Sequence, residues 1–438
     1  MENEILDFKQ NLRRHIEELL AKRQFEEAGE LVNQIVFSTD KFIFTYILDE
    51  WIRYIQILLE ILRCESRWEL ENNTLDKFPS YEEFKRVYLE VKFAIRYVLF
   101  GFGQVYTDKI VELCRTYNLS ADFVAVAIKN CVPQKYVNDT FAKIKVLFEK
   151  KEISKIFIER LDLYADFYLQ SNSNVGEAIG FNKCINAKNL IAANSSLIIK
   201  KIDANTPLER DNYINDKKIC YVLCGNNSRY VDEVIVYLKH QIMPEGFQAE
   251  VRVVENAKSM TQGYNAACRS TNAKYKVYIH QDTFIFDRLF TIKLLDIFSQ
   301  NEYKLLGVAG CKKIPKSGMW GDSEEPKYFA LLQDYILYVM DGTVESNKKV
   351  EEVQALDGVL LATCKDIEWR EDLFTHFHFY DISESLEYKK HGYKVGVLTD
   401  SQFGVLHEVS VNQKEHTIPE YEKARNIFIE EYKQFLKG

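Results

Sequence analysis

The feature that most constrains this chain is a change of hydrophobic periodicity near the middle of its 438 residues. In the first half, apolar residues recur three and four positions apart, as in Ile16, Leu19 and Leu20, a spacing typical of amphipathic helices. In the second half, short apolar runs alternate with helical patterns, which indicates strands joined by crossover helices. The chain is also longer than a domain with a single hydrophobic core usually is. The pattern therefore predicts a helical domain followed by an α/β domain.

The boundary between the two patterns is the polar segment 203–217, which contains Pro207. Linkers between domains are typically exposed and polar. We therefore expect an all-helical domain over residues 1–210 and an α/β domain over residues 217–438.

The α/β domain opens with strand-plus-helix units. Strands are expected at 219–223, 251–254, 275–279 and 305–310, helices at 230–238 and 260–268, and a closing helix at 418–436. This alternation predicts a parallel sheet with right-handed crossovers. Ligands bind at the carboxyl ends of such strands, because helix N-termini and loops converge there.

Composition excludes several classes of protein. The net charge of −8 argues against a nucleic-acid binder, which needs a basic face for phosphate contacts. The first residues lack the basic-then-apolar pattern of a secretory signal, and charges interrupt the most apolar stretch, 42–62, so it is not a membrane span. The odd count of nine scattered cysteines argues against a complete disulfide framework. We expect a cytoplasmic protein, either free or peripheral at the inner face of the membrane.

The most telling stretch is Ile279-His280-Gln281-Asp282-Thr283, which places a carboxylate at the end of the third strand. Oxygen ligands at such a position suit Mg²⁺ or Mn²⁺. The competing interpretation is a strand-end turn with a solvated acid. Glu255 ends the second strand, where it would accept hydrogen bonds from a ribose or a base edge, or else cap the following helix.

The loop after the first strand, residues 224–228, contains a single glycine. Dinucleotide-binding folds and methyltransferases need several there, so that the backbone can approach the ligand closely. Gly225 and Asn226 are still expected to contact a base or a ribose.

Further acids follow the sheet at Asp357, Glu371, Asp372 and Asp381. An acid before a helix commonly caps the helix N-terminus. Trp320 lies in a glycine-flanked loop, where it would either stack on a sugar ring or anchor the loop in the core.

The order of Glu255, the helix with Gly263-Tyr264-Asn265, the His280-Gln281-Asp282 strand end and the later acids resembles a family 2-type glycosyltransferase. These enzymes have the GT-A fold, a Rossmann-like nucleotide-sugar-binding domain. Within this family, the chain is most similar to a bacterial branch that has His-Gln-Asp in place of the Asp-x-Asp metal motif. The similarity covers residues 217–407, about half of the chain.

The resemblance implies an inverting, metal-dependent transferase that moves a sugar from a nucleoside-diphosphate sugar to a hydroxyl acceptor, which is a glycan, a lipid-linked molecule or a protein. Asp282 and His407 would be the ligands of Mn²⁺ or Mg²⁺, although a single histidine such as His407 is often an ordinary surface or core residue. Because His280 replaces the first acid, the protein supplies less negative charge, and tight metal binding without the nucleotide is not expected. The expected donor contacts are Gly225, Asn226, Glu255, Asn265, His280, Gln281, Asp357, Gly358 and Trp320.

In the same resemblance, Asp381 matches the second acid of the family's Glu-Asp catalytic motif, and Tyr380 stands where the first acid would be. Asp381 is therefore the expected general base, with Glu371 and Asp372 as rivals. The helical domain would orient the acceptor or mediate self-association. The sequence does not decide which base, sugar or acceptor is used.

Two other functions stay open. A binding protein that holds a nucleotide sugar without turnover is favoured by the missing first acid. A sugar-phosphate nucleotidyltransferase would need a glycine-rich, basic loop after the first strand, which residues 225–228 do not supply.

Overall fold

The computed structural model divides into two compact units, Met1–Asn182 and Lys183–Gly438. It describes residues 2–36, 50–67, 74–78, 80–99, 103–131, 137–149, 197–206, 213–225, 228–329, 331–333, 336–337, 348–399, 404–408 and 418–436. Within these ranges, none of the helices combines the length and the apolar character needed to cross a bilayer.

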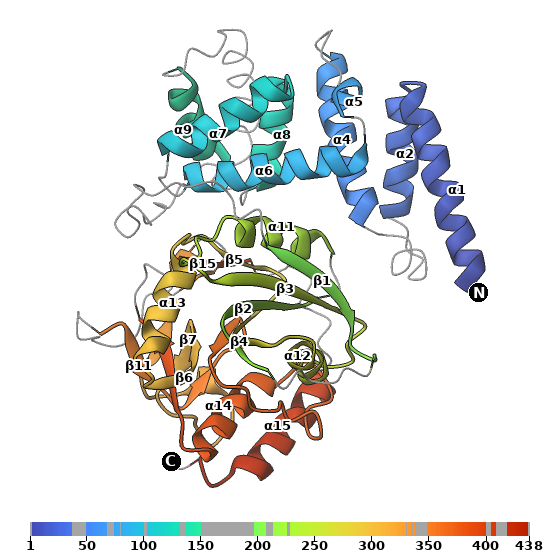
Figure 1. The fold of residues 1–438 in the computed structure, drawn as a ribbon. Helices are drawn as coiled ribbons and strands as arrows, with labels where there is room; N and C mark the ends of the chain where they lie inside the picture. Colours follow the sequence, from blue (N-terminus) through green and yellow to red (C-terminus); the bar gives the residue numbers. More distant parts are fainter. Residues whose placement is uncertain are drawn as a thin grey trace. The chain divides into compact units, whose positions relative to one another are not determined.

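The first unit is helical, as the periodicity predicts (Figure 1). Its helices are α1 (Glu2–Ala21), α2 (Phe25–Val36), α4 (Glu50–Arg67), α5 (Thr74–Lys77), α6 (Tyr81–Leu99), α7 (Gly103–Thr116), α8 (Ala121–Cys131) and α9 (Val137–Glu149). In α6, Phe84, Val87, Tyr88 and Val91 recur at helical spacing and all four are buried. The apolar stripe of this helix therefore faces the core of the unit.

A buried carboxylate joins three of these helices. Glu65 on α4 is 3% exposed, and it accepts hydrogen bonds from the backbone N–H of Thr74 at 2.9 Å and from the hydroxyl of Ser120 at 2.8 Å. The Ser120 hydroxyl also accepts the N–H of Phe123 at 3.1 Å, so Ser120 is the N-cap of α8. Because a buried carboxylate without partners is costly, these bonds fix the starts of α5 and α8 against α4.

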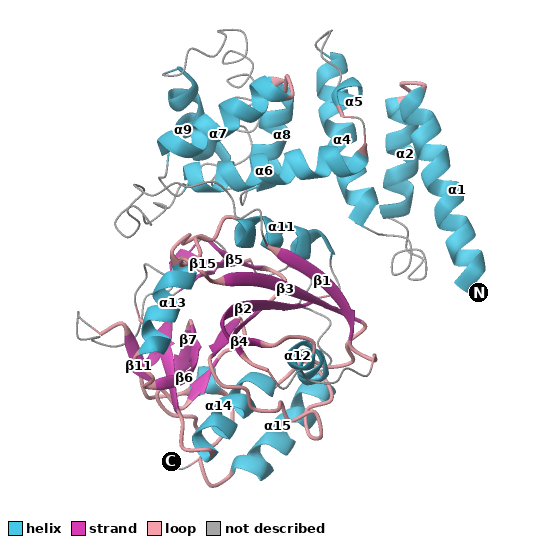
Figure 2. Cartoon of the chain, viewed as in Figure 1, coloured by secondary structure: helices cyan, strands magenta, loops and turns pink. Residues whose placement is uncertain are grey.

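The second unit is built on an eight-stranded sheet with the order β1-β3-β2-β4-β13-β6-β14-β11. Figure 2 shows strands of this unit together with the helices that cover them. The strands are β1 (Ile198–Asp203), β2 (Asn215–Cys224), β3 (Gln248–Glu255), β4 (Ala273–Ile279), β6 (Tyr303–Gly307), β11 (Val350–Glu352), β13 (Leu360–Thr363) and β14 (Lys394–Leu398). β1, β3, β2 and β4 run parallel, as predicted. The expectation of a fully parallel sheet is wrong beyond β4, because β13 is antiparallel to both β4 and β6.

The helices of this unit are α11 (Ser228–Lys239), α12 (Met260–Arg269), α13 (Phe290–Ser299), α14 (Tyr380–Lys390) and α15 (Ile418–Tyr432). Of these, α12, α13 and α14 pack against strands of the eight-stranded sheet. Side chains of β2 alternate between the two faces: Cys220 and Val222 lie in one core cluster with Tyr264 of α12, whereas the hydroxyl of Tyr221 meets Thr291 of α13. This alternation explains why β2 reads as a continuous apolar run in the sequence.

Two elements differ from the sequence-based expectation. β1 forms within a segment whose pattern was assigned to helix, and its largely exposed side chains give no alternating signal. The single strand expected at 305–310 is two strands, β6 and β7 (Ala309–Cys311). β7 belongs to a separate three-stranded sheet with β12 (Ala355–Leu356) and β8 (Lys327–Phe329).

Candidate active site

The site is assembled where β4 ends. His280-Gln281-Asp282 links β4 to β5 (Thr283–Ile285), which belongs to a small four-stranded sheet with β15 (Val405–His407), β9 (Leu331–Gln333) and β10 (Ile336–Leu337). His407 pairs with Thr283 in the β15–β5 ladder, and the N–H of Glu408 donates to the carbonyl of Asp282 at 2.9 Å. This pairing brings the late histidine beside the motif, although 125 positions separate the two in sequence.

Three metal-type side chains gather at this point. One ligand atom from each of His280, Asp282 and His407 lies within 4.8 Å of the other two. His407 Nε2 is 3.4 Å from Asp282 Oδ1, and both side chains are largely buried, at 14% and 13% exposed. The structure thus places the two predicted metal ligands together, and it adds His280, which the sequence assigned to the donor.

Electrostatics favour the ligating forms of Asp282 and His280. Burial raises the pKa of the Asp282 carboxyl, but the hydrogen bond from His407 and the charges of His407 and His280 outweigh burial, so the pKa lies below its ordinary value. Burial lowers the pKa of His280. At neutral pH the site therefore offers a carboxylate and a neutral imidazole, the forms that bind cations.

The spacing fits a divalent cation. Ligand atoms at about 2.1 Å from one ion are about 3.0 Å apart in adjacent octahedral positions and about 4.2 Å apart in opposite ones. The 3.4 Å between Asp282 and His407 falls between these values. One ring nitrogen of His280 lies within 4.8 Å of both of these ligand atoms.

Tyr380, the first residue of α14, reaches this cluster. Its hydroxyl lies 2.6 Å from His280 Nε2. The same hydroxyl lies so close to Gly358 that a Cβ on Gly358 would be 2.0 Å from the hydroxyl oxygen. Gly358 is thus a site of close approach, and the N–H of the same residue donates to Asp381 Oδ2 at 2.8 Å. Asp357 turns back on its own backbone through the N–H of Val359 at 2.9 Å.

Asp381 has the character of a base that works near neutral pH. Burial, followed by the charge of Asp357, raises the pKa of the Asp381 carboxyl to about 7. A carboxyl with this pKa can both accept and release a proton at pH 7. Asp381, the predicted base, directly follows Tyr380, whose hydroxyl contacts His280.

The two rival bases are placed differently. Asp372 forms a bidentate pair with Arg370 at 2.8 Å, and this hydrogen bonding holds the pKa of Asp372 below its usual range. Glu371 lies 3.3 Å from the amide nitrogen of Asn265. Arg370 also binds Glu387 and Glu431, so it ties this loop to α14 and α15.

Asn265 fixes the loop that carries Glu371. Its amide donates to the carbonyl of Trp369 at 3.0 Å, and its oxygen accepts the N–H of the same residue at 2.9 Å. Asn265 is 3% exposed. Because both the nitrogen and the oxygen of its carboxamide bond to the backbone of Trp369, Asn265 fixes the position of the loop that begins there.

The remaining predicted donor contacts are spread over the unit. A Cβ on Gly225 would lie 2.6 Å from Gln281 Oε1, so the end of β2 packs directly against the His-Gln-Asp turn. Asn226 lies outside the described residues. Glu255 pairs with Lys201 of the edge strand at 2.8 Å. Trp320 packs on Phe329 and against the core cluster that holds α15, as the core-anchoring interpretation expects.

Sequence reasoning gave no role to two tyrosines of this site. Tyr380 was noted only as a replacement for an acid, yet it contacts His280. The hydroxyl of Tyr264 is buried and finds no hydrogen-bond partner in the described part of the chain. Burial and the charges of Cys224 and Asp381 raise the pKa of Tyr264 well above its usual range. The signal for both was their position, because Tyr264 lies in the helix that carries the resemblance and Tyr380 precedes Asp381.

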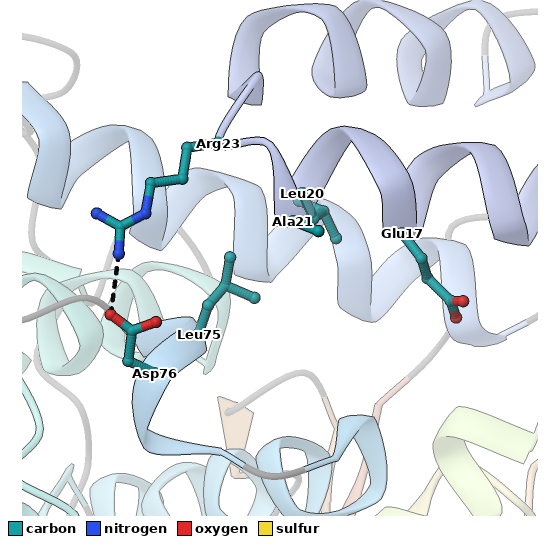
Figure 3. Close-up of a pocket in the computed structure, with 6 residues that line it drawn as sticks. All are labelled: Glu17, Leu20, Ala21, Arg23, Leu75 and Asp76. Atoms are coloured by element: carbon teal, nitrogen blue, oxygen red, sulfur yellow. Dashed lines mark hydrogen bonds and ion pairs between the residues drawn. The ribbon is translucent and has the colours of Figure 1, made fainter.

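The first unit contains a hollow of about 290 Å³ that holds none of these groups (Figure 3). Its lining residues are Glu17, Leu20, Ala21, Arg23, Leu75 and Asp76. Across it, Arg23 Nη2 lies 3.0 Å from Asp76 Oδ2, and both side chains are well exposed. An exposed pair of this kind contributes little to stability.

When the chain is compared with known proteins, a family model matches part of the second unit. Residues 220–432 match the model of a glycosyltransferase-like family. Curated proteins give no match. Among solved structures, a mannosyltransferase from Pyrobaculum calidifontis in complex with GDP-Man and Mn²⁺ matches 48% of this chain at 11% identity with a TM-score of 0.29. The match spans 62% of the length of that mannosyltransferase.

Proposed function

We propose that residues 217–438 form a GT-A glycosyltransferase that moves a sugar from a nucleoside-diphosphate sugar to a hydroxyl acceptor, with inversion and with the help of a divalent cation. The observation that carries the proposal is the cluster of Asp282 and His407 at the end of β4, within the region that matches the glycosyltransferase-like family. Strand ends of α/β sheets are where such folds bind ligands.

Asp282 and His407 would hold Mn²⁺ or Mg²⁺. When bound, the cation would neutralise the negative charge that the departing diphosphate gains. Gly225 packs closely against Gln281 at the end of β2, the edge of the sheet where a nucleoside would lie. Glu255, at the end of the neighbouring strand β3, is a candidate contact for the ribose.

Asp381 would act as the general base. It takes the proton of the acceptor hydroxyl as the hydroxyl oxygen bonds to the anomeric carbon and the bond from that carbon to the diphosphate oxygen breaks. One base opposite one leaving group gives a single displacement and therefore inversion. The elevated pKa of Asp381 supports this role, because a base with a pKa near the working pH is efficient. Asp372 is disfavoured because Arg370 occupies its carboxylate.

The helical unit is assigned to acceptor orientation or to self-association. Sedimentation of the full chain across a range of concentrations separates these roles. A mass that stays at 51.4 kDa favours acceptor orientation.

The proposal is tested on the full chain with a panel of sugar nucleotides. Thermal shifts are measured with uridine, guanosine, cytidine and thymidine diphosphates, with Mn²⁺ or with EDTA, and release of nucleoside diphosphate is then followed for the matching donors. We expect one nucleotide to stabilise the protein in a Mn²⁺-dependent way and its sugar donor to be turned over. Nucleotide binding with no product from any donor would favour a non-catalytic binding protein instead.

A further inference from the structure

We propose that Tyr421 and Asp322 form an acceptor subsite beside Asp381, and that this subsite binds an uncharged sugar ring. The inference rests on the transfer proposed above and deepens it, because it names the class of acceptor and two residues that select it. The sequence leaves the acceptor open among a glycan, a lipid-linked molecule and a protein.

Aromatic rings hold Tyr421 next to the segment that leads into Asp381. Tyr421 lies near the start of α15, and its ring centroid is 5.1 Å from that of His378 and 5.1 Å from that of Phe379. Phe379 is 6% exposed and also packs on Phe428 of α15, with the ring centroids 5.5 Å apart. Because Asp381 follows Phe379 by two positions, this packing places the Tyr421 ring near the proposed base.

The same face of α15 holds the loop that carries Asp322. Residues four positions apart share one face of a helix, so Arg425 lies beside Tyr421. Arg425 Nε donates to the carbonyl of Ser317 at 2.8 Å, and Ser317 Oγ donates to Asp322 Oδ2 at 2.8 Å. These two bonds fix the Asp322 carboxylate on the side of α15 that Tyr421 occupies. Tyr421 is half-buried and Asp322 is exposed, so a ligand can reach both side chains.

The charges around the Tyr421 hydroxyl agree with this arrangement. Burial raises the pKa of this hydroxyl, Arg425 lowers it, and the charges of Asp381 and Asp322 raise it further. The hydroxyl therefore lies close enough to both carboxylates to feel their charge. Because its pKa is raised, it stays protonated at neutral pH, and it can donate one hydrogen bond and accept another.

The groups of this subsite match an uncharged sugar. A carboxylate and a phenol hydroxyl bond to sugar hydroxyls, and an aromatic face packs on the apolar side of the ring. A phosphate or carboxylate on the acceptor would instead meet the negative charges of Asp322 and Asp381, and like charges repel. Arg425 is already engaged, because its Nη1 donates to both carboxylate oxygens of Glu422 at 3.1 Å.

The competing account is a packing role. Tyr421 would then only support Phe379, and Asp322 would only close its own loop on Ser317. This account predicts that Tyr421→Phe, which keeps the ring and removes only the hydroxyl, leaves sugar binding unchanged.

The experiment measures the binding of methyl glycosides to the full-length protein by saturation-transfer NMR. The probes are the methyl α- and β-glycosides of glucose, galactose, mannose and N-acetylglucosamine, and glucose 6-phosphate is the charged counterpart of the glucosides. We expect at least one glycoside to bind. Tyr421→Phe and Asp322→Asn should each weaken that binding at least about 3-fold, the effect of one lost hydrogen bond.

The matched control is Tyr213→Phe, which removes an equivalent hydroxyl from the same unit. Tyr213 is 66% exposed and lies two residues before β2 begins, at the opposite end of that strand from the edge where ligands bind. The control should bind the glycoside like the wild type.

Transfer gives a second readout that a packing role would not move. With a sugar nucleotide and a glycoside that the wild type uses, Tyr421→Phe should raise the KM for the acceptor at least about 3-fold. The KM for the donor should stay the same, because the subsite lies on the acceptor side of Asp381. Thermal unfolding of Tyr421→Phe and Asp322→Asn checks that both variants are folded.

Three results would overturn the inference: no binding of any glycoside, equal binding by the wild type and both variants, or tighter binding of glucose 6-phosphate than of the methyl glucosides. If a donor is nevertheless turned over, the proposed transferase survives and the acceptor subsite does not. If a glycoside binds through Tyr421 but no donor is bound or turned over, the proposed function fails and the sugar-binding subsite stands.

Discussion

The hydroxyl of Tyr380 lies 2.6 Å from Nε2 of His280. Tyr380 is the first residue of α14, and His280 directly follows the last residue of β4. The contact joins the start of α14, which also carries Asp381, to the end of β4, which leads to Asp282. The proposed base and the proposed metal ligands are therefore linked through one hydrogen bond. At the position where the resemblance expects the first acid of the catalytic motif, this chain has a tyrosine that contacts His280.

Replacing Tyr380 with phenylalanine tests this link. Tyr380→Phe keeps the ring but removes the partner of His280 Nε2, so the imidazole loses its fixed tautomer. Loss of such an outer contact typically lowers metal affinity about 10–100-fold. Titration with Mn²⁺ in the presence of nucleoside diphosphate measures the change, with Tyr393→Phe as the control because Tyr393 stacks on His391 away from the cluster. Unchanged Mn²⁺ affinity in Tyr380→Phe would remove Tyr380 from the site.

Gly358 should not tolerate a methyl group. In Gly358→Ala the new Cβ would lie 2.0 Å from the Tyr380 hydroxyl, so the tyrosine must move away from His280. Overpacking of this kind costs about 1–3 kcal/mol of unfolding free energy. Gly321→Ala is the matched control, since a Cβ there meets nothing within 4 Å. Urea unfolding of both variants gives the comparison, and equal midpoints would show that Tyr380 moves without cost.

Asp282→Asn should leave the fold intact and abolish metal-dependent transfer. The amide keeps the shape of the side chain and can still meet His407 Nε2, but it lacks the negative charge that a divalent cation needs. Thermal unfolding in EDTA checks the fold, and transfer at saturating Mn²⁺ checks the function. A variant with wild-type turnover would contradict the metal role of Asp282.

Much of the second unit is predictable from the sequence because its central strands are buried on both faces. β2 contains a continuous apolar run, and β3 and β4 are apolar strands that each contain a buried cation, Arg252 or Lys276. The carboxylate after β4 is visible as a polar interruption. The antiparallel insertion of β13 between β4 and β6 is not predictable in this way. Strand direction depends on long-range pairing, and no local pattern in residues 360–363 records it.

The individual residues of the site could be predicted from the sequence, but the contacts between their side chains could not. Asp282, His407 and Asp381 stand in recognisable positions of the resemblance, but which side chains meet depends on tertiary packing. The approach of Tyr380 to His280 requires α14 to pack over Gly358, a contact between residues 100 positions apart. Likewise, the amide of Asn265 bonds the backbone of Trp369 through both its nitrogen and its oxygen, a contact between residues 104 positions apart.

The pH dependence of transfer should follow Asp381. If its ionised form is the base, kcat/KM rises about tenfold per pH unit below about 7 and levels off above that value, because the pKa of Asp381 is raised to about 7. Asp372→Asn should keep the same midpoint, since the pKa of Asp372 lies below its usual range. Asp381→Asn should retain donor affinity and lose transfer. A midpoint near 4 in the wild type would reassign the base.

Stability gives an independent readout of the same group. Because the folded pKa of Asp381 lies above its ordinary value of 3.8, the folded state holds this proton more tightly than the unfolded state does. The stability contributed by protonated Asp381 is therefore present below pH 4 and is lost as pH rises through about 7, with a slope of at most about 1.4 kcal/mol per pH unit. Asp381→Asn cannot ionise, so its unfolding free energy between pH 4 and 7 should lack this downward slope. Parallel curves for variant and wild type would mean that Asp381 titrates at an ordinary pKa and is not the group tuned for proton transfer.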